Sequence, residues 1–415
     1  MALAPHYFSD SAYLQLRTRL LAWAGAHPQC AVLDSCGYQD PGGLGAWRLL
    51  VGVRGDTRWQ AAPPPPGSWY FGGLGYAWKN SLEQLASTTQ PGIPFPDQAF
   101  FEADTVLGIP RQGNQLICLH GSMPPLDPYE EVIDQPQSVL LALATQMDRA
   151  AYGRAFRQVQ QWLWAGELYE MNLCRELTAT ALGLDTLGLW QRLLQLSPVP
   201  MAAYLRLGAW CLMSASPERY LLHRNGLLLS EPIKGTVRRA GQEEAEHRLL
   251  TTDPKLRAEN TMIADLVRND LSRVCVPGTV QAQLCQPLTL STLHHLVSRV
   301  YGVLQQAASP WQALEASFPP GSMTGAPKVA AMQAIDRLEP VGRGLYSGAV
   351  GYTDPAGNYD FAVVIRSFIY HSPTGRLSTH VGGALTVDSD CEAEWAETET
   401  KALTLRQGSL FSSTH

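Results

Sequence analysis

The sequence has no hydrophobic run long enough to cross a membrane. Its longest apolar stretches, such as residues 43–53, are interrupted well before the ~20 apolar residues that a spanning helix needs. The first ten residues lack a basic region followed by an apolar stretch, so a secretory signal is not expected. Charged residues make up 16% and hydrophobic residues 45%, which is too apolar for a disordered chain. We therefore expect a globular protein of the cytoplasm.

The eight cysteines form no Cys-x-x-Cys pair, the spacing that zinc sites and redox centres use. We expect reduced, buried thiols. The chain also has no excess of positive charge, since its formal net charge is −6. Nucleic acid requires a basic face, so a nucleic-acid partner is not expected.

Lysine is scarce. Of 31 basic residues only five are lysines, and four of these, including Lys234, lie in the C-terminal half. A lysine amine can be deprotonated, or can fit a space that a guanidinium cannot. The distribution suggests that some of these lysines do chemistry, although chance would explain it equally well.

The length of 415 residues fits two or three structural units or one large α+β domain. Residues 1–145 are predicted to be β-rich, with strands at 30–34, 47–53 and 115–120 separated by Gly and Pro clusters. Residues 146–408 alternate strands with long helical patterns. We place the boundary between an N-terminal β-rich region and a second region near residue 145.

Hydrophobic periodicity predicts four helices in the second region, at 138–166, 254–273, 327–338 and 392–408. Asp253 and Pro254 supply an N-cap and a first-turn proline for the second helix. The last helix places Glu394, Glu397 and Lys401 on one face. The helix macrodipole alone explains such a carboxylate pair. Mg²⁺ would need a further ligand, for which Glu259 is the candidate.

Two polar tips flank a predicted strand at 220–230. Glu218 lies at one tip and Lys234 at the other. A solvated surface hairpin would explain both. The alternative is a general acid beside an amine nucleophile, which requires burial to raise the pKa of Glu218 and to lower that of Lys234.

The loop at 318–328 combines glycines with hydroxyls ahead of a helix N-terminus that can hold an anion. Ser322, Thr324 and Gly325 are its candidate ligand-binding residues. The order Gly-Lys-Ser/Thr of a Walker loop is absent. A plain loop with a helix start is the alternative.

Three further positions are candidates for ligand contact. Gly382 and Gly383 follow a strand and allow close approach, or form a β-bulge. Arg366, within a predicted apolar strand at 361–368, needs a buried carboxylate or a ligand carboxylate as its partner. His295 beside Leu and Val is either a satisfied core histidine or a residue of the site.

Taken together and in this order, these segments resemble the chorismate-utilising enzymes over roughly residues 150–405. The matching segments are SPER at 216–219, PIKGT at 232–236, RAEN at 257–260, LVRNDL at 266–271, HLVS at 295–298, GSMTGAPK at 321–328, GLYSGAVGY at 344–352, IR at 365–366, GGA at 382–384 and EAEWAET at 392–398. The N-terminal third matches more weakly, through LDS at 33–35 and FGGLGY at 71–76.

The resemblance implies an α+β fold like that of anthranilate synthase component I, with two large, mostly antiparallel β-sheets packed together and helices on the outside. Residues 146–408 would be the chorismate-binding catalytic region. Lys234 matches the aminodeoxychorismate synthases, whose large component has this lysine where anthranilate and isochorismate synthases usually have alanine. The implied reaction converts chorismate and ammonia to 4-amino-4-deoxychorismate, through a covalent adduct of Lys234 at C2, for 4-aminobenzoate and folate synthesis.

The resemblance also implies residue roles. Glu218 would be the general acid or base at the C4 oxygen of chorismate. The Mg²⁺ ligands would be Glu259 and Glu397, with Glu394 nearby. The residues expected to line the substrate site are Ser322, Thr324, Gly325, Tyr346, Arg366, Gly382, Gly383, His295 and Glu170.

The sequence departs from the family pattern at two positions. Glu170 stands where the family commonly has Gln, so it could pair with the Lys234 ammonium or help to deprotonate it. Leu256 stands where an acidic residue is frequent, which would weaken metal binding.

Ammonia needs a source. Because no cysteine lies in a Gly-x-Cys-x-Gly nucleophile elbow, we expect ammonia from a separate glutamine amidotransferase subunit. The alternatives to the main reading are an anthranilate synthase component I and a non-catalytic chorismate-binding subunit.

Overall fold

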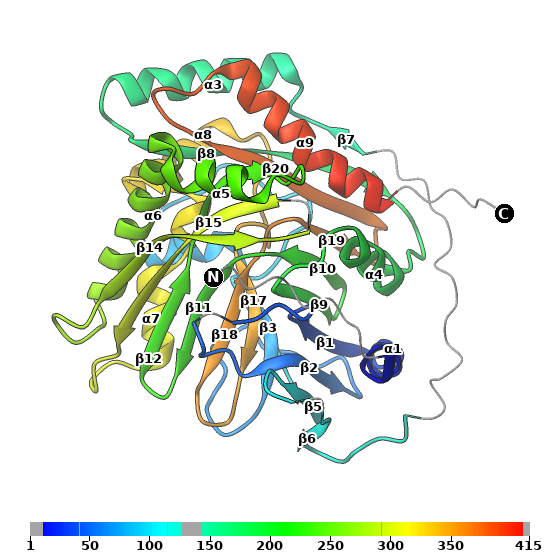
Figure 1. Ribbon diagram of the computed structural model, residues 1–415. Coiled ribbons are helices and arrows are strands. Elements are labelled where there is room, and N and C mark those ends of the chain that lie inside the picture. The colour runs from blue at the N-terminus through cyan, green and yellow to red at the C-terminus, as the bar shows by residue number, and fades with distance from the viewer. Residues whose placement is uncertain (1–10, 41, 114, 127–142, 292, 410–415) are drawn as a thin grey trace.

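Two large antiparallel sheets form the centre of the molecule, and helices lie outside them (Figure 1). The structure is a computed structural model that describes residues 11–40, 42–113, 115–126, 143–291 and 293–409. Within these residues the first sheet has eleven strands and the second has nine. The order of the first is β16-β8-β20-β19-β10-β9-β1-β2-β5-β6, with β7 on β8, and that of the second is β13-β15-β12-β11-β18-β17-β3-β4, with β14 on β15.

Strands from both sides of residue 145 build each sheet. The first sheet contains β1 (Gln29–Asp34), β2 (Trp47–Arg54), β5 (Thr105–Pro110), β6 (Ile117–His120), β7 (Ala144–Thr145), β8 (Glu170–Thr180), β9 (Met201–Leu207), β10 (Trp210–Ser216), β16 (Gly325–Ala326), β19 (Ser367–His371) and β20 (Arg376–Leu385). The second contains β3 (Tyr70–Leu74), β4 (Gln98–Glu102), β11 (Arg219–Arg224), β12 (Leu227–Glu231), β13 (Ile233–Arg238), β14 (Gln281–Thr289), β15 (Leu293–Val303), β17 (Ala349–Thr353) and β18 (Tyr359–Val363).

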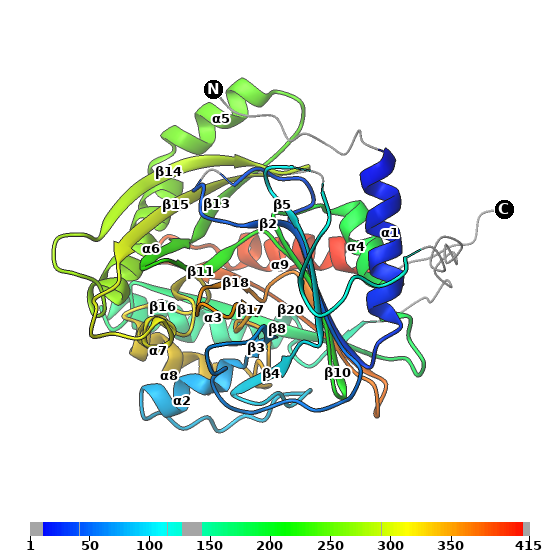
Figure 2. The same ribbon diagram turned by 90° about the horizontal axis from the view of Figure 1, so that it is seen from below.

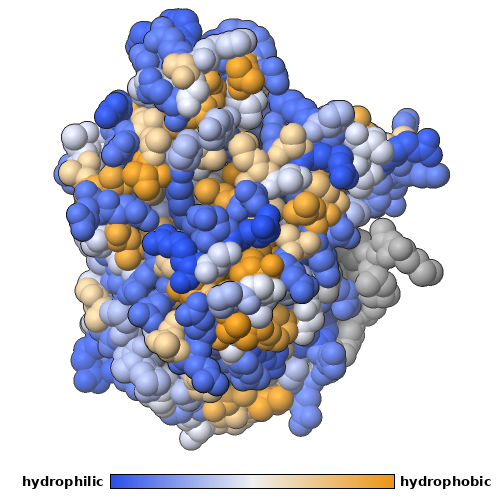
Figure 3. Space-filling view, turned by 90° about the vertical axis from the view of Figure 1, so that its left-hand side faces the viewer, coloured by the Kyte–Doolittle hydropathy of each residue, from blue (hydrophilic) through white to orange (hydrophobic). Residues whose placement is uncertain are grey.

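The helices cover the outer faces. They are α1 (Ser11–Gly25), α2 (Lys79–Leu82), α3 (Arg149–Trp164), α4 (Thr186–Leu196), α5 (Glu243–Thr252), α6 (Pro254–Ser272), α7 (Pro310–Ser317), α8 (Lys328–Leu338) and α9 (Cys391–Ser409). Figure 2 shows α1 and α4 outside the first sheet and α5 and α6 on the opposite side of the molecule. On the face that carries α6, apolar patches alternate with hydrophilic side chains (Figure 3). No helix among the described residues is long and apolar enough to span a bilayer.

Apolar side chains from both sheets meet in one core. Leu50 and Leu212 of the first sheet pack in the same cluster as Phe71, Phe100 and Phe361 of the second, and all five are fully buried or nearly so. A second cluster joins the outer face of the first sheet to α1, α4 and α9. Burying both sheet faces removes the large apolar area that these strands would otherwise expose to water. All eight cysteines are free thiols, six of them buried.

Two of the crossovers that take the chain from one sheet to the other lie next to each other. Residues 217–218 join β10 to β11, and residues 364–366 join β18 to β19. The crossovers are hydrogen-bonded to each other's strands, from Val363 N to Glu218 O at 3.0 Å and from Ala215 N to Arg366 O at 3.2 Å. The prediction of one strand over 361–368 is therefore wrong. It is two strands of different sheets, with Arg366 between them at φ 51°.

Three of the four predicted helices agree closely with the structure. α6 begins at Pro254, and the Asp253 side chain accepts a hydrogen bond from Leu256 N at 2.9 Å. α8 and α9 also lie where periodicity placed them. The helix expected over 138–166 begins only at Arg149, because Ala144–Thr145 pairs with β8 instead. Residues 138–142 of that prediction lie outside the described residues.

A buried ion pair fixes the segments that converge on the end of β8. Arg343 and Glu339 are joined by two hydrogen bonds of 2.8 and 2.6 Å, and their side chains are 1% and 4% exposed. Arg343 also donates to the carbonyls of Met323 and Asn172, at 2.7 and 2.9 Å. Glu339 accepts from Cys174 N at 2.9 Å. One guanidinium thus connects β8, the loop before α8 and the residues after α8.

We expect Arg343→Met to lower the free energy of unfolding by roughly 3–5 kcal/mol, because it leaves the Glu339 carboxylate buried without a partner. Denaturant unfolding followed by tryptophan fluorescence would measure the change. Arg268→Met, at a half-exposed arginine of α6, is the matched control. Replacing Glu339 by Met as well should restore much of the loss. A single variant as stable as the control would contradict the role assigned to the pair.

Candidate active site

Lys234 is aimed into the molecule by a β-bulge. Lys234 pairs with Leu296 of β15 and Thr236 with His295, so Gly235 is the extra residue between them. Gly235 has φ 85°, a conformation that favours glycine. Asn260 of α6 donates to Lys234 O at 3.2 Å and to Leu296 O at 3.0 Å. Bulges re-aim side chains next to active sites.

The Lys234 amine forms an ion pair with Glu170. Nζ lies 2.8 Å from Glu170 Oε1, and the two side chains are 11% and 1% exposed. Burial opposes the charge on Lys234, but Glu170 together with Glu259 and Glu218 raises the pKa of Lys234 above its usual range. Glu170 Oε2 has no hydrogen-bond partner among the described residues. The amine is thus held protonated in a pocket of carboxylates, and the surface-hairpin alternative is excluded.

Glu218 lies on the first crossover and is 4% exposed. Ser322 Oγ donates to Glu218 Oε1. Burial raises the pKa of Glu218 to about 7, against the lowering effects of Ser322, Lys234 and Arg366. A carboxyl group with this pKa can both give and take a proton at neutral pH.

His295 of β15 and Arg366 of the second crossover are in direct contact. An arginine can only donate, so the 3.1 Å contact from Arg366 Nη2 makes His295 Nε2 an acceptor. His295 Nδ1 then carries the proton and donates to Thr236 Oγ1 at 2.9 Å. Burial, assisted by Arg366 and Lys401, lowers the pKa of His295 well below its usual value. His295 is therefore a neutral residue that orients Arg366, and burial lowers the pKa of Arg366 to about 10.

The loop before α8 turns Ser322 toward Glu218. The other two candidate residues of this loop, Thr324 and Gly325, contact backbone atoms. Thr324 is fully buried, and its hydroxyl donates to Gly321 O at 3.1 Å. Gly325 pairs with Met171 of β8, and a Cβ there would lie 2.1 Å from Glu170 O. These two residues hold the loop against β8, next to Glu170.

A side chain at either of the two glycines of β20 would meet different neighbours. A Cβ on Gly382 would lie 2.4 Å from Cys174 Sγ, so this position is restricted by packing. A Cβ on Gly383 would lie 3.1 Å from Glu394 Oε2 and 3.7 Å from Glu397 Oε1. The carboxylates of α9 therefore converge above Gly383.

Tyr346 lies at the inner edge of this region. Its hydroxyl is 3.3 Å from Cys174 Sγ, and its ring stacks on His380 with the ring centroids 4.6 Å apart. His380 is buried, and neither of its ring nitrogens has a partner among the described residues. Burial lowers the pKa of His380 to about 3, so its imidazole is neutral.

The three expected metal ligands are carboxylates on two helices. Burial raises the pKa of Glu259, and the charge of Glu394 adds to this effect. Burial also raises the pKa of Glu394, to which the charge of Glu397 contributes. Glu397 pairs with Lys401 at 2.7 Å, and Glu394 accepts from Ser389 at 2.7 Å. The described residues contain no ready group of three metal-binding side chains. The donor type fits Mg²⁺, which takes one or two carboxylates and completes its shell with water and substrate oxygens.

Leu256 packs against the bulge instead of facing the carboxylates. Its Cβ lies 3.4 Å from the position of a Cβ on Gly235, and it joins a small cluster with Leu296. Sequence reasoning missed Asn260, Thr236 and Arg343, which position the candidate residues. RAEN and PIKGT contain two of these three, but their hydrogen bonds depend on the register of β13 and β15.

A family model described as chorismate binding enzyme matches residues 34–407. The chain is 36% identical over 363 residues to aminodeoxychorismate synthase component 1 of Salmonella typhimurium, covering 83% of this chain and 79% of that protein. It is 36% identical over 343 residues to the Escherichia coli protein of the same name, with coverage of 80% and 74%.

Solved structures show the same fold. Anthranilate synthase component I from Streptococcus pneumoniae matches with a TM-score of 0.72 at 24% identity, over 83% of this chain and 82% of that chain. The menaquinone-specific isochorismate synthase of Escherichia coli also has a TM-score of 0.72, at 19% identity, over 98% and 92%. The fold expected from the sequence is confirmed.

We expect Glu218→Gln to stabilise the protein at alkaline pH. Between about pH 4.3 and 7 the folded protein holds a proton on Glu218 that the unfolded chain has lost, so stability falls as pH rises through this window. Glutamine does not titrate, so the variant avoids this fall in the free energy of unfolding, which amounts to up to roughly 3 kcal/mol at pH 8. Denaturant unfolding at pH 5 and pH 8 would measure it, with the exposed Glu244→Gln as control. If the free energy of unfolding changed equally with pH in the variant and the wild type, this would contradict the raised pKa of Glu218.

Proposed function

The chain belongs to the chorismate binding enzymes, and we propose that it aminates chorismate at C4 with ammonia, giving 4-amino-4-deoxychorismate. The observation that carries this proposal is the buried Lys234 amine among carboxylates, at the lysine of PIKGT. The name of the relatives from Salmonella typhimurium and Escherichia coli supports it.

Lys234 acts as the nucleophile. It must first lose a proton, and Glu170 is the acceptor in contact with it. The amine then forms a bond to C2, the ring double bonds shift, and the C4–O bond breaks. Glu218, protonated in about half of the molecules near neutral pH, delivers its proton to the leaving oxygen, which departs as water.

Ammonia completes the exchange. It bonds to C4, the ring double bonds shift back, the bond between C2 and the Lys234 nitrogen breaks, and the electron pair of that bond returns to the nitrogen. The Glu218 carboxylate takes one proton from the new amine, and the proton on Glu170 returns to Lys234. The balance is chorismate and ammonia in, aminodeoxychorismate and water out.

The substrate is a dianion and the chain is net acidic, so positive charge must be local. Arg366, oriented by neutral His295, is the candidate partner for one carboxylate. Glu259, Glu394 and Glu397 would hold Mg²⁺, which would neutralise the charge of the ring carboxylate. Ammonia would come from a separate glutamine amidotransferase, consistent with the "component 1" in the relatives' name. We place the reaction in cytoplasmic 4-aminobenzoate and folate synthesis.

Lys234→Ala should reduce aminodeoxychorismate formation by at least roughly 10³-fold, because no amine reaches C2. Mass spectrometry of the product made from chorismate, Mg²⁺ and an ammonium salt would measure it. Lys234→Arg keeps the charge opposite Glu170 but stays protonated, so it should be equally inactive. Unchanged product and rate in either variant would refute the covalent role.

The same assay separates the alternatives. An aromatic amine formed without an added lyase would identify an anthranilate synthase activity instead. Chorismate binding without turnover, at saturating Mg²⁺ and ammonium, would identify a non-catalytic subunit.

Glu170→Gln should move the acidic limb of the kcat/KM profile to lower pH by roughly one unit or more, since a nearby carboxylate raises the pKa of Lys234. Measuring kcat/KM for chorismate from pH 6 to 10 would test this. Glu167→Gln, at an exposed glutamate three residues away, should leave the profile unchanged. An unchanged midpoint would contradict the prediction, whereas a loss of rate at every pH in addition to the shift would reflect the role of Glu170 as the proton acceptor.

A further inference from the structure

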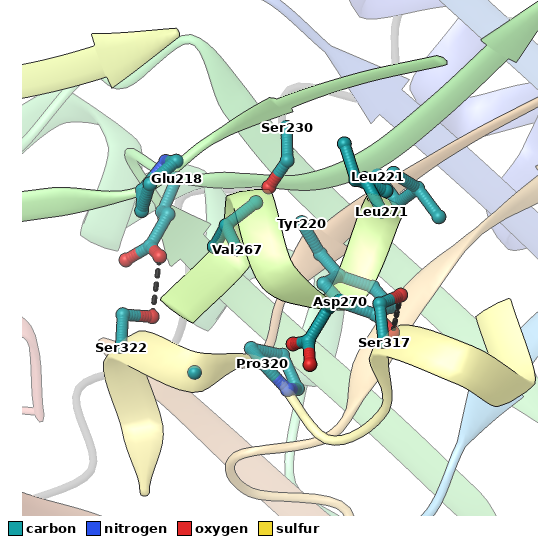
Figure 4. Close-up of a pocket in the computed structure, with 12 residues that line it drawn as sticks. Glu218, Tyr220, Leu221, Ser230, Val267, Asp270, Leu271, Ser317, Pro320 and Ser322 are labelled. Atoms are coloured by element: carbon teal, nitrogen blue, oxygen red, sulfur yellow. Dashed lines mark hydrogen bonds between the residues drawn. The ribbon is translucent and has the colours of Figure 1, made fainter. Parts of the chain in front are cut away.

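A small cavity lies directly behind Glu218, between α6, the 3₁₀ turn η3 (Gly321–Met323) and strands β11 and β12 (Figure 4). Its volume is about 10 Å³, which is about the room that one water molecule needs. Twelve residues line it, and all twelve are buried. Glu218 and Ser322 belong to both this cavity and the candidate active site, so they form the wall between the two.

The cavity presents hydrogen-bond acceptors that the protein leaves open. Lys328 Nζ binds Asp270 Oδ2 at 2.9 Å, while Oδ1 has no hydrogen bond among the described residues. Ser230 Oγ likewise makes none within the described chain, and Figure 4 shows it above the space between Glu218 and Asp270. Ser230 and Asp270 are 6% and 4% exposed. Both side chains line the cavity, so a small polar guest inside it can hydrogen-bond to these two oxygens.

The lining selects the guest by size and charge. Two carboxylates exclude an anion, and the volume excludes anything much larger than water. Ammonia has about the size of water and offers three N–H donors to the open acceptors. A water molecule fits the same space and is the alternative occupant.

We propose that this cavity is the ammonia subsite of the enzyme, from which the nucleophile reaches C4 past Glu218. The proposal rests on the proposed function. Oxygen leaves and nitrogen enters at the same carbon, and Glu218 serves that carbon in both steps. When ammonia bonds to C4, the bond from C2 to Lys234 breaks and Glu218 receives the proton, as balanced above. Ser230 and Asp270 act only by holding ammonia, so they are positioning residues.

The test is to fill the cavity and measure the KM for ammonia apart from that for chorismate. Ser230→Val replaces the hydroxyl by a methyl group and adds a second methyl group, so it fills the cavity without adding charge, whereas Ser230→Ala removes the hydroxyl and leaves the space open. Initial rates at fixed pH, with ammonium chloride varied at saturating chorismate and Mg²⁺, give the ammonium KM. We expect Ser230→Val to raise it roughly tenfold and Ser230→Ala by less, with the chorismate KM unchanged.

Val267→Ile adds one methylene from the α6 side and serves as a second filling variant if Ser230→Val does not fold. Val329→Ile makes the same change at an exposed position of α8 and is its control. An ammonium KM unchanged by both filling variants would overturn the proposal and identify a structural water site. Wild-type protein that does not aminate chorismate would overturn the proposed function itself, and this failure is seen before any variant is made.

Discussion

The hydrogen bonds between the two crossovers are the constraint on which the candidate site depends. Each crossover takes the chain from one sheet to the other, and the two backbone bonds between Glu218 and Val363 and between Ala215 and Arg366 keep them side by side. Because the sheets pack around a common apolar core, the crossovers cannot separate without opening that core. An acid and a guanidinium that are nearly 150 residues apart in sequence therefore face the same small volume.

Charge balance in that volume explains the protonation states. The charges of five glutamates lie near those of Lys234, Arg366 and Lys401, and each carboxyl responds to its own neighbours. Burial dominates at Glu218, whose pKa is raised to about 7, whereas the lysines outweigh burial at Glu397 and lower its pKa. Carboxyls with opposite shifts suit different tasks, and the raised pKa of Glu218 suits proton transfer.

The resemblance to the chorismate-utilising enzymes predicted the fold class. Periodicity and capping residues predicted α6, α8 and α9, because they determine such elements locally. Motif order also brought Glu218 and Lys234 forward as candidates. It did not predict the split of 361–368 into strands of two sheets, since an apolar pattern does not record which sheet a strand joins. The bulge at Gly235 depends on pairing with β15, and Arg343 depends on carbonyls from distant segments. Such contacts are tertiary and leave no local signal.

Candidate residues in this chain fall into two kinds that the sequence alone does not separate. Lys234, Glu218 and Arg366 present functional groups to one another across the site, whereas Thr324, Gly325 and Gly382 are required by close backbone or side-chain packing. The second kind fixes the first, because the turn of the GSMTGAPK loop against β8 brings Ser322 to Glu218. The GSMTGAPK loop therefore combines two kinds of residue: Ser322 contacts Glu218, and its neighbours restrict where the Ser322 side chain points.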